Sequence, residues 1–341
     1  MRYGRELPGY PFNAKALLTR CLIVSQRKVW GHWLARFSDF GKPALDWNEE
    51  QTQAGIADII HAGKPAMVAR FGSGELEATL RGLAIQERRE HGLAHAAVRL
   101  VAGRSAPFWW DNSIRGGLVW GAGFFPPDDA SLDAFAARSL AACSKLDVLA
   151  AWQEGETRLR QRFFPNAIFC NMGSFSCPFR QENPWYRALG GMRVLVVHPF
   201  AETIRSQYDR REALFPKDRA LPEFTLLTYK PAVTLAGNWT ASRDKTWFAA
   251  LDRMTSEIAA LDFDVALVGA GAYGMSLAAA VKDMGRIGLH TGGATQLYFG
   301  IKGKRWDDSD VGRHFYNDHW VRPLPSEVPG NSNTVEGGCY W

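Results

Sequence analysis

The chain contains 341 residues, of which 46% are hydrophobic and 22% are charged. These values are typical of a soluble globular protein, and the length allows one large α/β domain or two small ones. The net charge of +5 suits an anionic ligand or a membrane surface, but it falls short of the strongly basic surface of nucleic-acid-binding proteins. We therefore expect no nucleic-acid partner.

The cysteines and the apolar runs indicate a cytoplasmic protein. Five cysteines are scattered without a CxxC pair, which argues against a disulfide framework and against a zinc site. No apolar run reaches the roughly 18–20 residues that a membrane-spanning helix needs, and the first residues lack a signal-peptide pattern. We expect reduced thiols and a cytoplasmic location, with the inner face of the membrane as an alternative place of action.

Residues 1–45 predict an N-terminal helical appendage. Within residues 16–37, aromatic and aliphatic side chains recur at helical spacing beside basic residues. In the interpretation that we favour, this helix packs on the rest of the protein. The alternative is a peripheral contact of residues 16–37 with an anionic membrane surface.

The remaining residues, 46–341, are expected to form one α/β domain. Asn48 and Gln51 resemble a capping box at the start of a helix, and Gly63 is placed to end it. The apolar run at 65–71 predicts a buried strand, which stops before a glycine-rich turn and a second helix.

The second half of the domain has the clearer pattern. From about residue 85 to 190 the sequence is too irregular to define elements, apart from a helix that starts at Asp129 or Ser131 and runs through Leu146. The last 150 residues alternate between helical patterns and short apolar runs, which predict strands at 192–197, 224–229, 264–268 and 286–290. This alternation predicts an α/β fold with a mostly parallel sheet flanked by helices.

The first candidate site is the turn RFGSGE, at residues 70–75. In parallel sheets, ligands bind beyond the carboxyl ends of strands, where the N–H groups of a new helix favour an anion. Arg70 has the forked donors that suit phosphate, and Gly72, Ser73 and Gly74 let the backbone approach a ligand. Glu75 suits a divalent metal, or it only compensates the helix dipole in a capped turn without function.

The second candidate site is the turn GAGAYG, between a predicted strand and a helix. Its candidate ligand-binding residues are Gly269, Gly271, Tyr273 and Gly274. The pattern matches the GxGxxG turn of dinucleotide-binding folds, but those folds need an acidic residue after the next strand. Here that strand ends in His290 and Thr291, and no acidic residue follows before Asp307. A phosphate-binding turn is the better interpretation, and a purely structural turn is the alternative.

The third candidate site is the segment GGATQLYFGIKGKRW, which follows the last predicted strand. Its candidate residues are Gly292, Gly293, Thr295, Gln296, Lys302, Lys304 and Arg305. Three cations within four positions are suited to neutralise a diphosphate, although charge clusters are more often solvated surface.

Other patterns are weaker. The pairs Asp262/Asp264 and Asp308/Asp310 match the DxD pattern of many metal-dependent glycosyltransferases, but the first precedes its strand and the second lies in an apparent loop. His198 and His290 end strands and are well placed for a cleft, where each is more often a hydrogen-bonded structural residue than a catalytic group.

The segment RFGSGE resembles the RFGDGE segment of GT-D-type glycosyltransferases, in which Asp and Glu form a DxE motif. That motif is associated with manganese or magnesium and with the diphosphate of a nucleotide sugar. By position, Glu75 matches the Glu and Arg70 the Arg, whereas Ser73 stands where the family has Asp. The resemblance therefore implies a metal held by Glu75 alone, or a diphosphate bound through the basic cluster at 302–305.

Further segments resemble a GT-D-like branch of bacterial polysaccharide-biosynthesis proteins. They are GAGFFP, HPF, DVALVGAGAYG, GGATQLYFGIKGKRWD and the terminal VEGGCYW, so the resemblance covers roughly residues 65–341. It implies a Rossmann-like fold and a glycosyltransferase, with Glu75 and Arg70 as catalytic residues. The expected donor is a nucleotide-diphosphate hexose such as UDP-glucose or UDP-galactose. The expected acceptor is a glycan or a lipid-linked acceptor in cell-surface polysaccharide biosynthesis.

Two alternatives remain open from the sequence. Ser73 in place of the motif Asp suggests a protein that binds a nucleotide sugar without catalysis. The GAGAYG turn suggests, less strongly, a dinucleotide-dependent oxidoreductase.

Overall fold

The fold is taken from a computed structural model, which describes residues 21, 25, 41–335 and 337–341. The predicted appendage at 1–45, with its membrane-facing segment at 16–37, lies almost entirely outside the described residues. Within the described part, no helix is both long enough and apolar enough to cross a bilayer. The five cysteines are free thiols.

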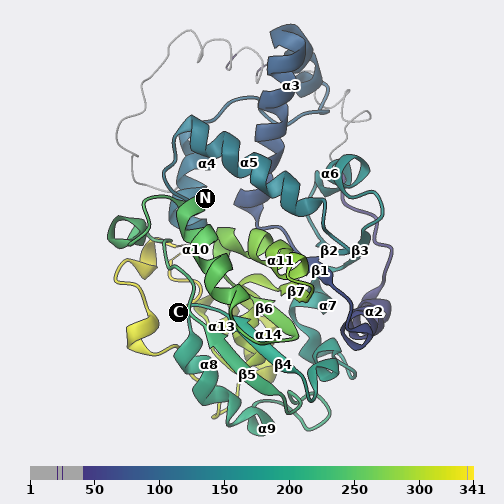
Figure 1. The fold of residues 1–341 in the computed structure, drawn as a ribbon, viewed down its shortest axis with the longest axis vertical. Coiled ribbons are helices and arrows are strands. Elements are labelled where there is room, and N and C mark those ends of the chain that lie inside the picture. Colours follow the sequence, from purple (N-terminus) through teal and green to yellow (C-terminus); the bar gives the residue numbers. More distant parts are fainter. Residues whose placement is uncertain (1–20, 22–24, 26–40, 336) are drawn as a thin grey trace.

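The described residues form a seven-stranded sheet in which every pair of neighbouring strands is parallel (Figure 1). The strand order is β3-β2-β1-β7-β6-β4-β5. The strands are β1 (Ala66–Ala69), β2 (Val148–Ala151), β3 (Ile168–Asn171), β4 (Arg193–Val197), β5 (Thr225–Tyr229), β6 (Val265–Val268) and β7 (Ile287–His290). The predicted parallel sheet is confirmed, and the fold is Rossmann-like α/β.

The strand order puts many loops at one edge of the sheet. From β1 the chain builds outward through β2 to β3, and the later strands β4 and β5 form the other half of the sheet. Strands β6 and β7 then fill the space between β4 and β1. Because all strands are parallel, their carboxyl ends lie at the same edge, which is where open α/β sheets bind ligands.

Helices cover both faces of the sheet, because successive strand residues point to opposite sides. In β1, Met67 and Ala69 join one apolar core, whereas Ala66 and Val68 join the other. The first core lies under α3 (Ser73–Val101), α5 (Asp129–Cys143), α10 (Trp247–Ala259) and α11 (Gly274–Asp283). The second lies under α2 (Glu49–Ala62), α7 (Met172–Ser176), α8 (Ala201–Tyr208) and α12 (Thr295–Tyr298).

Shorter elements complete the described chain. The α-helices are α4 (Asn112–Gly116), α6 (Glu156–Phe163), α9 (Arg211–Leu214), α13 (Lys304–Asp307) and α14 (Asp310–Phe315). A π-helix, η2 (Gly117–Ala122), follows α4. The 3₁₀-helices are η3 (Pro178–Arg180), η4 (Trp185–Leu189), η5 (Asn238–Ala241), η6 (Gly271–Tyr273), η7 (Gly292–Ala294), η8 (Pro325–Glu327) and η9 (Ser332–Thr334).

The predicted end signals of α2 are confirmed. The Asn48 side chain accepts a hydrogen bond from the Gln51 backbone N–H, and the Gln51 side chain accepts one from the Asn48 backbone N–H. Gly63 ends the helix with φ 60°, in the left-handed region that a glycine adopts without strain.

The middle of the chain differs from the prediction. Helix α3 begins at Ser73, inside the predicted turn, and it continues through the charged segment to Val101 with an interruption at Gly92 (φ 86°). The predicted helix through Leu146 ends earlier, at Cys143, because a new strand follows. Strands β2 and β3 were missed because both lie in the segment from about residue 85 to 190, whose irregular pattern did not define elements.

Candidate functional site

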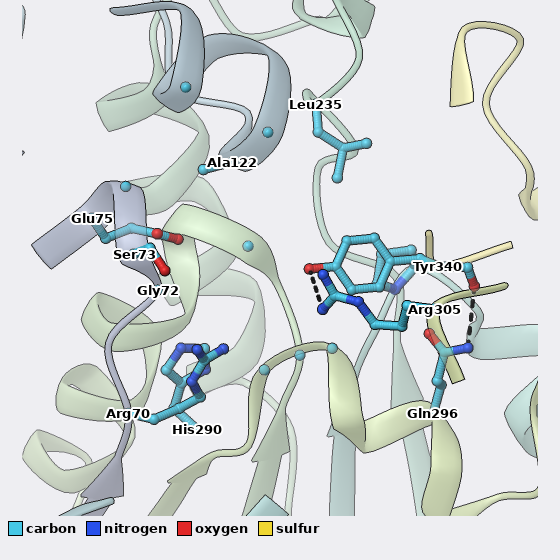
Figure 2. Close-up of a pocket in the computed structure, with 18 of the residues that line it drawn as sticks. Arg70, Gly72, Ser73, Glu75, Ala122, Leu235, His290, Gln296, Arg305 and Tyr340 are labelled. Atoms are coloured by element: carbon cyan, nitrogen blue, oxygen red, sulfur yellow. Dashed lines mark hydrogen bonds between the residues drawn. The ribbon is translucent and has the colours of Figure 1, made fainter. Parts of the chain in front are cut away.

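A cavity of about 490 Å³ opens at the carboxyl edge of the sheet (Figure 2). This volume lies within the range of small-molecule sites. Its walls come from the loops after β1, β2, β4, β6 and β7, together with η2, the loop between β5 and α10, and the last residues of the chain.

All three predicted sites contribute to this cavity. The predicted residues that line it are Arg70, Gly72, Ser73, Gly74, Glu75, Gly269, Gly271, Gly292, Gly293, Gln296 and Arg305. In Figure 2, Arg70, Ser73 and Glu75 stand on one side of the cavity, and Arg305 and Tyr340 on the other. The structure therefore brings together segments that are far apart in the sequence.

Three predicted residues have structural positions behind the cavity wall. Tyr273 is buried and stacks on Trp247, with ring centroids 5.1 Å apart and planes 7° from parallel. Thr295 is fully buried. Gly274 lies against the ring of His290, where an added Cβ would be 2.0 Å from a ring carbon. None of the three is among the residues that line the cavity.

The basic cluster does not converge as a group. Lys302 lies over the Tyr316 ring, with Nζ 5.4 Å from the centroid, and exposed Lys304 donates to the Gly337 carbonyl at 3.1 Å. Only Arg305 lines the cavity, at its exposed rim. One cation of the predicted three therefore faces the cavity.

The turn after β1 places a carboxylate and the start of a helix at the cavity. Gly72 precedes α3 in an extended conformation and, as a glycine, offers no capping side chain, while the Glu75 carboxylate accepts a hydrogen bond from its own backbone N–H in the first turn. The Glu75 carboxylate folds back over Gly72, where an added Cβ would lie 2.0 Å from Oε2. Burial raises the pKa of Glu75, and Arg70 partly opposes this rise. Glycine at position 72 thus makes room for the Glu75 carboxylate.

Arg70 is a half-buried cation that lines the cavity and forms no salt bridge among the described residues. Its Nε atom is buried without a hydrogen-bond partner, and its guanidinium carbon lies 5.4 Å from the centroid of the Trp152 ring. Burial lowers the pKa of Arg70, and the nearby Glu75 partly offsets this effect. A guanidinium remains charged in such surroundings, so this position favours an anionic ligand.

Two neutral histidines, His198 after β4 and His290 at the end of β7, line the cavity. The Phe200 backbone N–H donates to His198 Nδ1 at 3.1 Å, so the ring proton is on Nε2. His290 has its Nδ1 3.0 Å from the Val268 carbonyl oxygen; a carbonyl only accepts, so here Nδ1 carries the proton. Burial lowers the pKa of His198 to about 3, and burial with nearby Arg70 lowers that of His290 to about 4. Neither ring adds charge near neutral pH.

The turn after β6 packs tightly against its neighbours. A Cβ added to Gly269 would lie 2.6 Å from His198 Cδ2, 2.7 Å from the Gly292 carbonyl oxygen and 2.8 Å from Thr295 Oγ1. This glycine therefore lets the loops after β4, β6 and β7 meet at one wall of the cavity.

Sequence reasoning missed the residues contributed by β2 and by the end of the chain. Trp152, which follows β2, is 45% exposed and lines the cavity, and its indole N–H donates to the Phe71 carbonyl at 3.2 Å. Tyr340 and Trp341 close the opposite wall. Trp152 was missed because β2 was not recognised, and the terminal aromatic pair carries no signal of its position.

Glu156 is a second carboxylate that the sequence did not single out. It is fully buried, and its Oε2 accepts hydrogen bonds from the backbone N–H groups of Trp152 and Gln153 at 2.7 and 3.0 Å. Burial raises the pKa of Glu156 to about 7. This carboxyl holds the loop that presents Trp152 to the cavity.

The donor set of the cavity does not fit a divalent metal by itself. Magnesium and manganese prefer several oxygen ligands, usually with more than one carboxylate. Here Glu75 is the one carboxylate beside Ser73, because the Glu77 carboxylate accepts from the Arg81 guanidinium at 2.9 Å. In the described part of the chain, no three His, Cys, Asp or Glu residues gather as a metal site.

The two DxD patterns also lie away from the cavity. Asp262 and Asp264 pair with Arg193 at the start of β4, the opposite edge of the sheet. Asp308 and Asp310 flank the cap of α14, and neither lines the cavity. The prediction that the first pair stands at the wrong edge agrees with this placement.

Comparisons with protein-family models, with curated proteins and with solved structures gave no match to this chain.

Proposed function

We propose that this protein is a glycosyltransferase that moves a hexose from a nucleotide-diphosphate sugar to a glycan or lipid-linked acceptor in cell-surface polysaccharide biosynthesis. The observation that carries the proposal is the half-buried guanidinium of Arg70, whose Nε has no hydrogen-bond partner, in a cavity that it shares with the start of α3. Both features attract the anionic diphosphate of such a donor. The resemblance of RFGSGE to the GT-D motif supports the same reading.

The transfer requires that one bond breaks, that one bond forms and that one proton moves to a base. The bond between the anomeric carbon and a diphosphate oxygen breaks, and its electron pair stays on that oxygen. A bond forms from the anomeric carbon to an acceptor hydroxyl oxygen, and the hydroxyl proton passes to a base. Arg70 and the N–H groups of α3 stabilise the charge on the departing diphosphate. Glu75 is the proposed base because it lines the same cavity, and burial raises its pKa above the ordinary value.

Aromatic surface at the cavity suits the remainder of the donor. Trp152 stands on one wall and Tyr340 and Trp341 on another, all lining the cavity. Trp152 is exposed and the terminal pair is half-buried, and aromatic rings at a cavity stack on a nucleobase or on the apolar face of a sugar. The proposed place of reaction is the cytoplasm or the inner face of the membrane, where nucleotide sugars meet lipid-linked acceptors.

An oxidoreductase is the less favoured candidate. The strand after the GAGAYG turn is β7, which ends at His290 and is followed by Thr291. A dinucleotide-binding fold has an acidic residue at this point for the ribose hydroxyls. The absence of that residue argues for a phosphate-binding turn instead.

The test is a calorimetric titration of the full chain with UDP, UDP-glucose and NADH, followed by an assay of UDP release from the sugar donor. We expect UDP and UDP-glucose to bind and UDP to be released. Tight NADH binding without UDP binding would overturn the proposal in favour of an oxidoreductase. Donor binding without any release or transfer, with each acceptor class supplied, would favour the non-catalytic alternative suggested by Ser73.

A further inference from the structure

We infer that Arg70 takes the place of a divalent cation at this site, so that a nucleoside diphosphate binds without metal and through a guanidinium, a serine hydroxyl and backbone N–H groups. The inference rests on the proposed function, because it concerns the same diphosphate. It adds to that function that Arg70, and not a divalent metal ion, neutralises the diphosphate.

The first observation is the charge balance of the wall formed by the β1–α3 turn. It contains one cation, Arg70, whose Nε has no partner, and the carboxylate of Glu75. Glu77 also lines this wall, but its carboxylate is held by Arg81. A divalent metal here would find a single carboxylate without a salt bridge, and the cationic guanidinium of Arg70 would repel it.

The second observation is the residue at position 73. Ser73 is exposed, lines the cavity and is the first residue of α3. Its hydroxyl donates a hydrogen bond to a phosphate oxygen, whereas a carboxylate at the same position would repel that oxygen unless a cation lay between them. Serine at position 73 and the free Nε of Arg70 therefore both favour an anion that contacts the protein directly.

The third observation is the arrangement of donors. Arg70 follows the last residue of β1, and the first N–H groups of α3 begin three residues later, after Gly72, which has no side chain to cap them. In Figure 2, Arg70 and Ser73 rise from the same turn on one side of the cavity, across from Arg305 on the other. A diphosphate between these walls meets donors from both sides, and guanidinium groups bind phosphate oxygens in a bidentate manner.

The experiment measures UDP affinity of the full chain by calorimetry, once in EDTA and once in excess manganese. We expect the two dissociation constants of the wild type to agree within about threefold. Arg70→Met should weaken binding about tenfold or more in both buffers. The control Arg138→Met removes an exposed arginine of α5, 3.9 Å from Asp252, and should leave the affinity unchanged.

A second variant keeps the test decisive if Arg70→Met does not fold. Ser73→Asp changes an exposed first-turn position, where an acidic residue is compatible with the helix dipole. We expect this variant to bind UDP about tenfold more weakly in EDTA and to regain affinity in manganese. Recovery by manganese in the variant alone supports the inference.

The outcomes separate the inference from the proposed function. If the wild type binds UDP only in manganese, the inference is overturned and the glycosyltransferase proposal stands. If manganese strengthens UDP binding to the wild type as much as to Ser73→Asp, the inference is likewise overturned. If UDP binds in neither buffer, the proposed function fails and the inference fails with it.

Discussion

At the scale of single residues, the buried carboxyl of Glu156 makes the stability of the protein depend on pH. Glu156 has a pKa raised to about 7, above the ordinary value of 4.5. The folded state therefore holds this proton more tightly than the unfolded state, so the stabilisation is complete below pH 4.5 and is lost as the pH rises through 7. Between these pH values the free energy of unfolding should fall by up to about 3 kcal/mol.

Glu156→Gln should remove this pH dependence, because an amide resembles the protonated carboxyl and does not ionise. Urea unfolding at pH 5 and pH 8 measures the effect. From pH 5 to pH 8 the free energy of unfolding should fall for the wild type but stay nearly constant for the variant. Glu154→Gln, which changes an exposed carboxylate two residues earlier, should follow the wild-type profile. Parallel curves for Glu156→Gln and wild type would refute the assignment.

Gly269 is the residue at which close packing of the loops is most easily tested. An alanine Cβ would meet the Gly292 carbonyl oxygen at 2.7 Å, and backbone cannot move aside as a flexible side chain can. We expect Gly269→Ala to lower the free energy of unfolding by about 1–3 kcal/mol and to weaken UDP binding. At Gly330 an added Cβ meets nothing within 4 Å, so Gly330→Ala is the matched control. Equal stabilities of the two variants would contradict this account.

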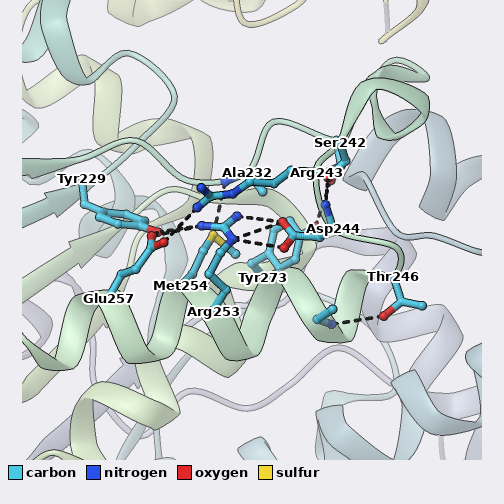
Figure 3. Close-up of polar contacts among 12 residues, drawn as sticks. Tyr229, Ala232, Ser242, Arg243, Asp244, Thr246, Arg253, Met254, Glu257 and Tyr273 are labelled. Carbon is cyan, nitrogen blue, oxygen red and sulfur yellow. Dashed lines mark hydrogen bonds and ion pairs between the residues drawn. The ribbon is translucent and has the colours of Figure 1, made fainter.

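At the scale of elements, a polar network fixes the long loop between β5 and α10 (Figure 3). Arg253 of α10 contacts Asp244 Oδ2 at 2.8 Å and Glu257 Oε2 at 3.0 Å, and Glu257 also accepts from the Tyr229 hydroxyl. Asp244 is only 10% exposed, so its charge depends on this partner. The same loop carries Leu235, which lines the cavity.

Arg253→Met should release that loop. We expect faster amide hydrogen exchange across residues 230–246 and a loss of about 1–3 kcal/mol in the free energy of unfolding, since the mostly buried carboxylate of Asp244 loses its charged donor. Arg138→Met on α5 is the control, because its contact with Asp252 is exposed on both sides. Unchanged exchange in the loop would mean that apolar packing alone holds it.

Elements were predictable where the apolar pattern is long enough. Strands β1, β4, β5, β6 and β7 follow from uninterrupted apolar runs, and the ends of α2 follow from Asn48 and Gly63. Strands β2 and β3 could not be predicted in this way. The run of β2, Val148–Ala151, is short enough that a helix could equally contain it. Because β2 was not predicted, Trp152, which follows it and lines the cavity, was not identified as a site residue.

At the scale of the whole molecule, the meeting of the strand-end turns follows from the parallel sheet. Once the strands are parallel, the turns at Arg70, Gly269 and Gly292 must share an edge. The order of strands and the return of Tyr340 to that edge depend on long-range packing that local sequence does not encode. For the same reason Lys302 and Lys304 were expected at the cavity, although their contacts lie elsewhere.

The central claim is that this one cavity holds a nucleoside diphosphate. Amide hydrogen exchange of the full chain with and without saturating UDP tests it most directly. The account predicts slower exchange in three separate segments at once, 70–76, 269–274 and 292–297, while 201–208 on α8 stays unchanged. UDP that binds without slowing exchange in any of the three segments would contradict it.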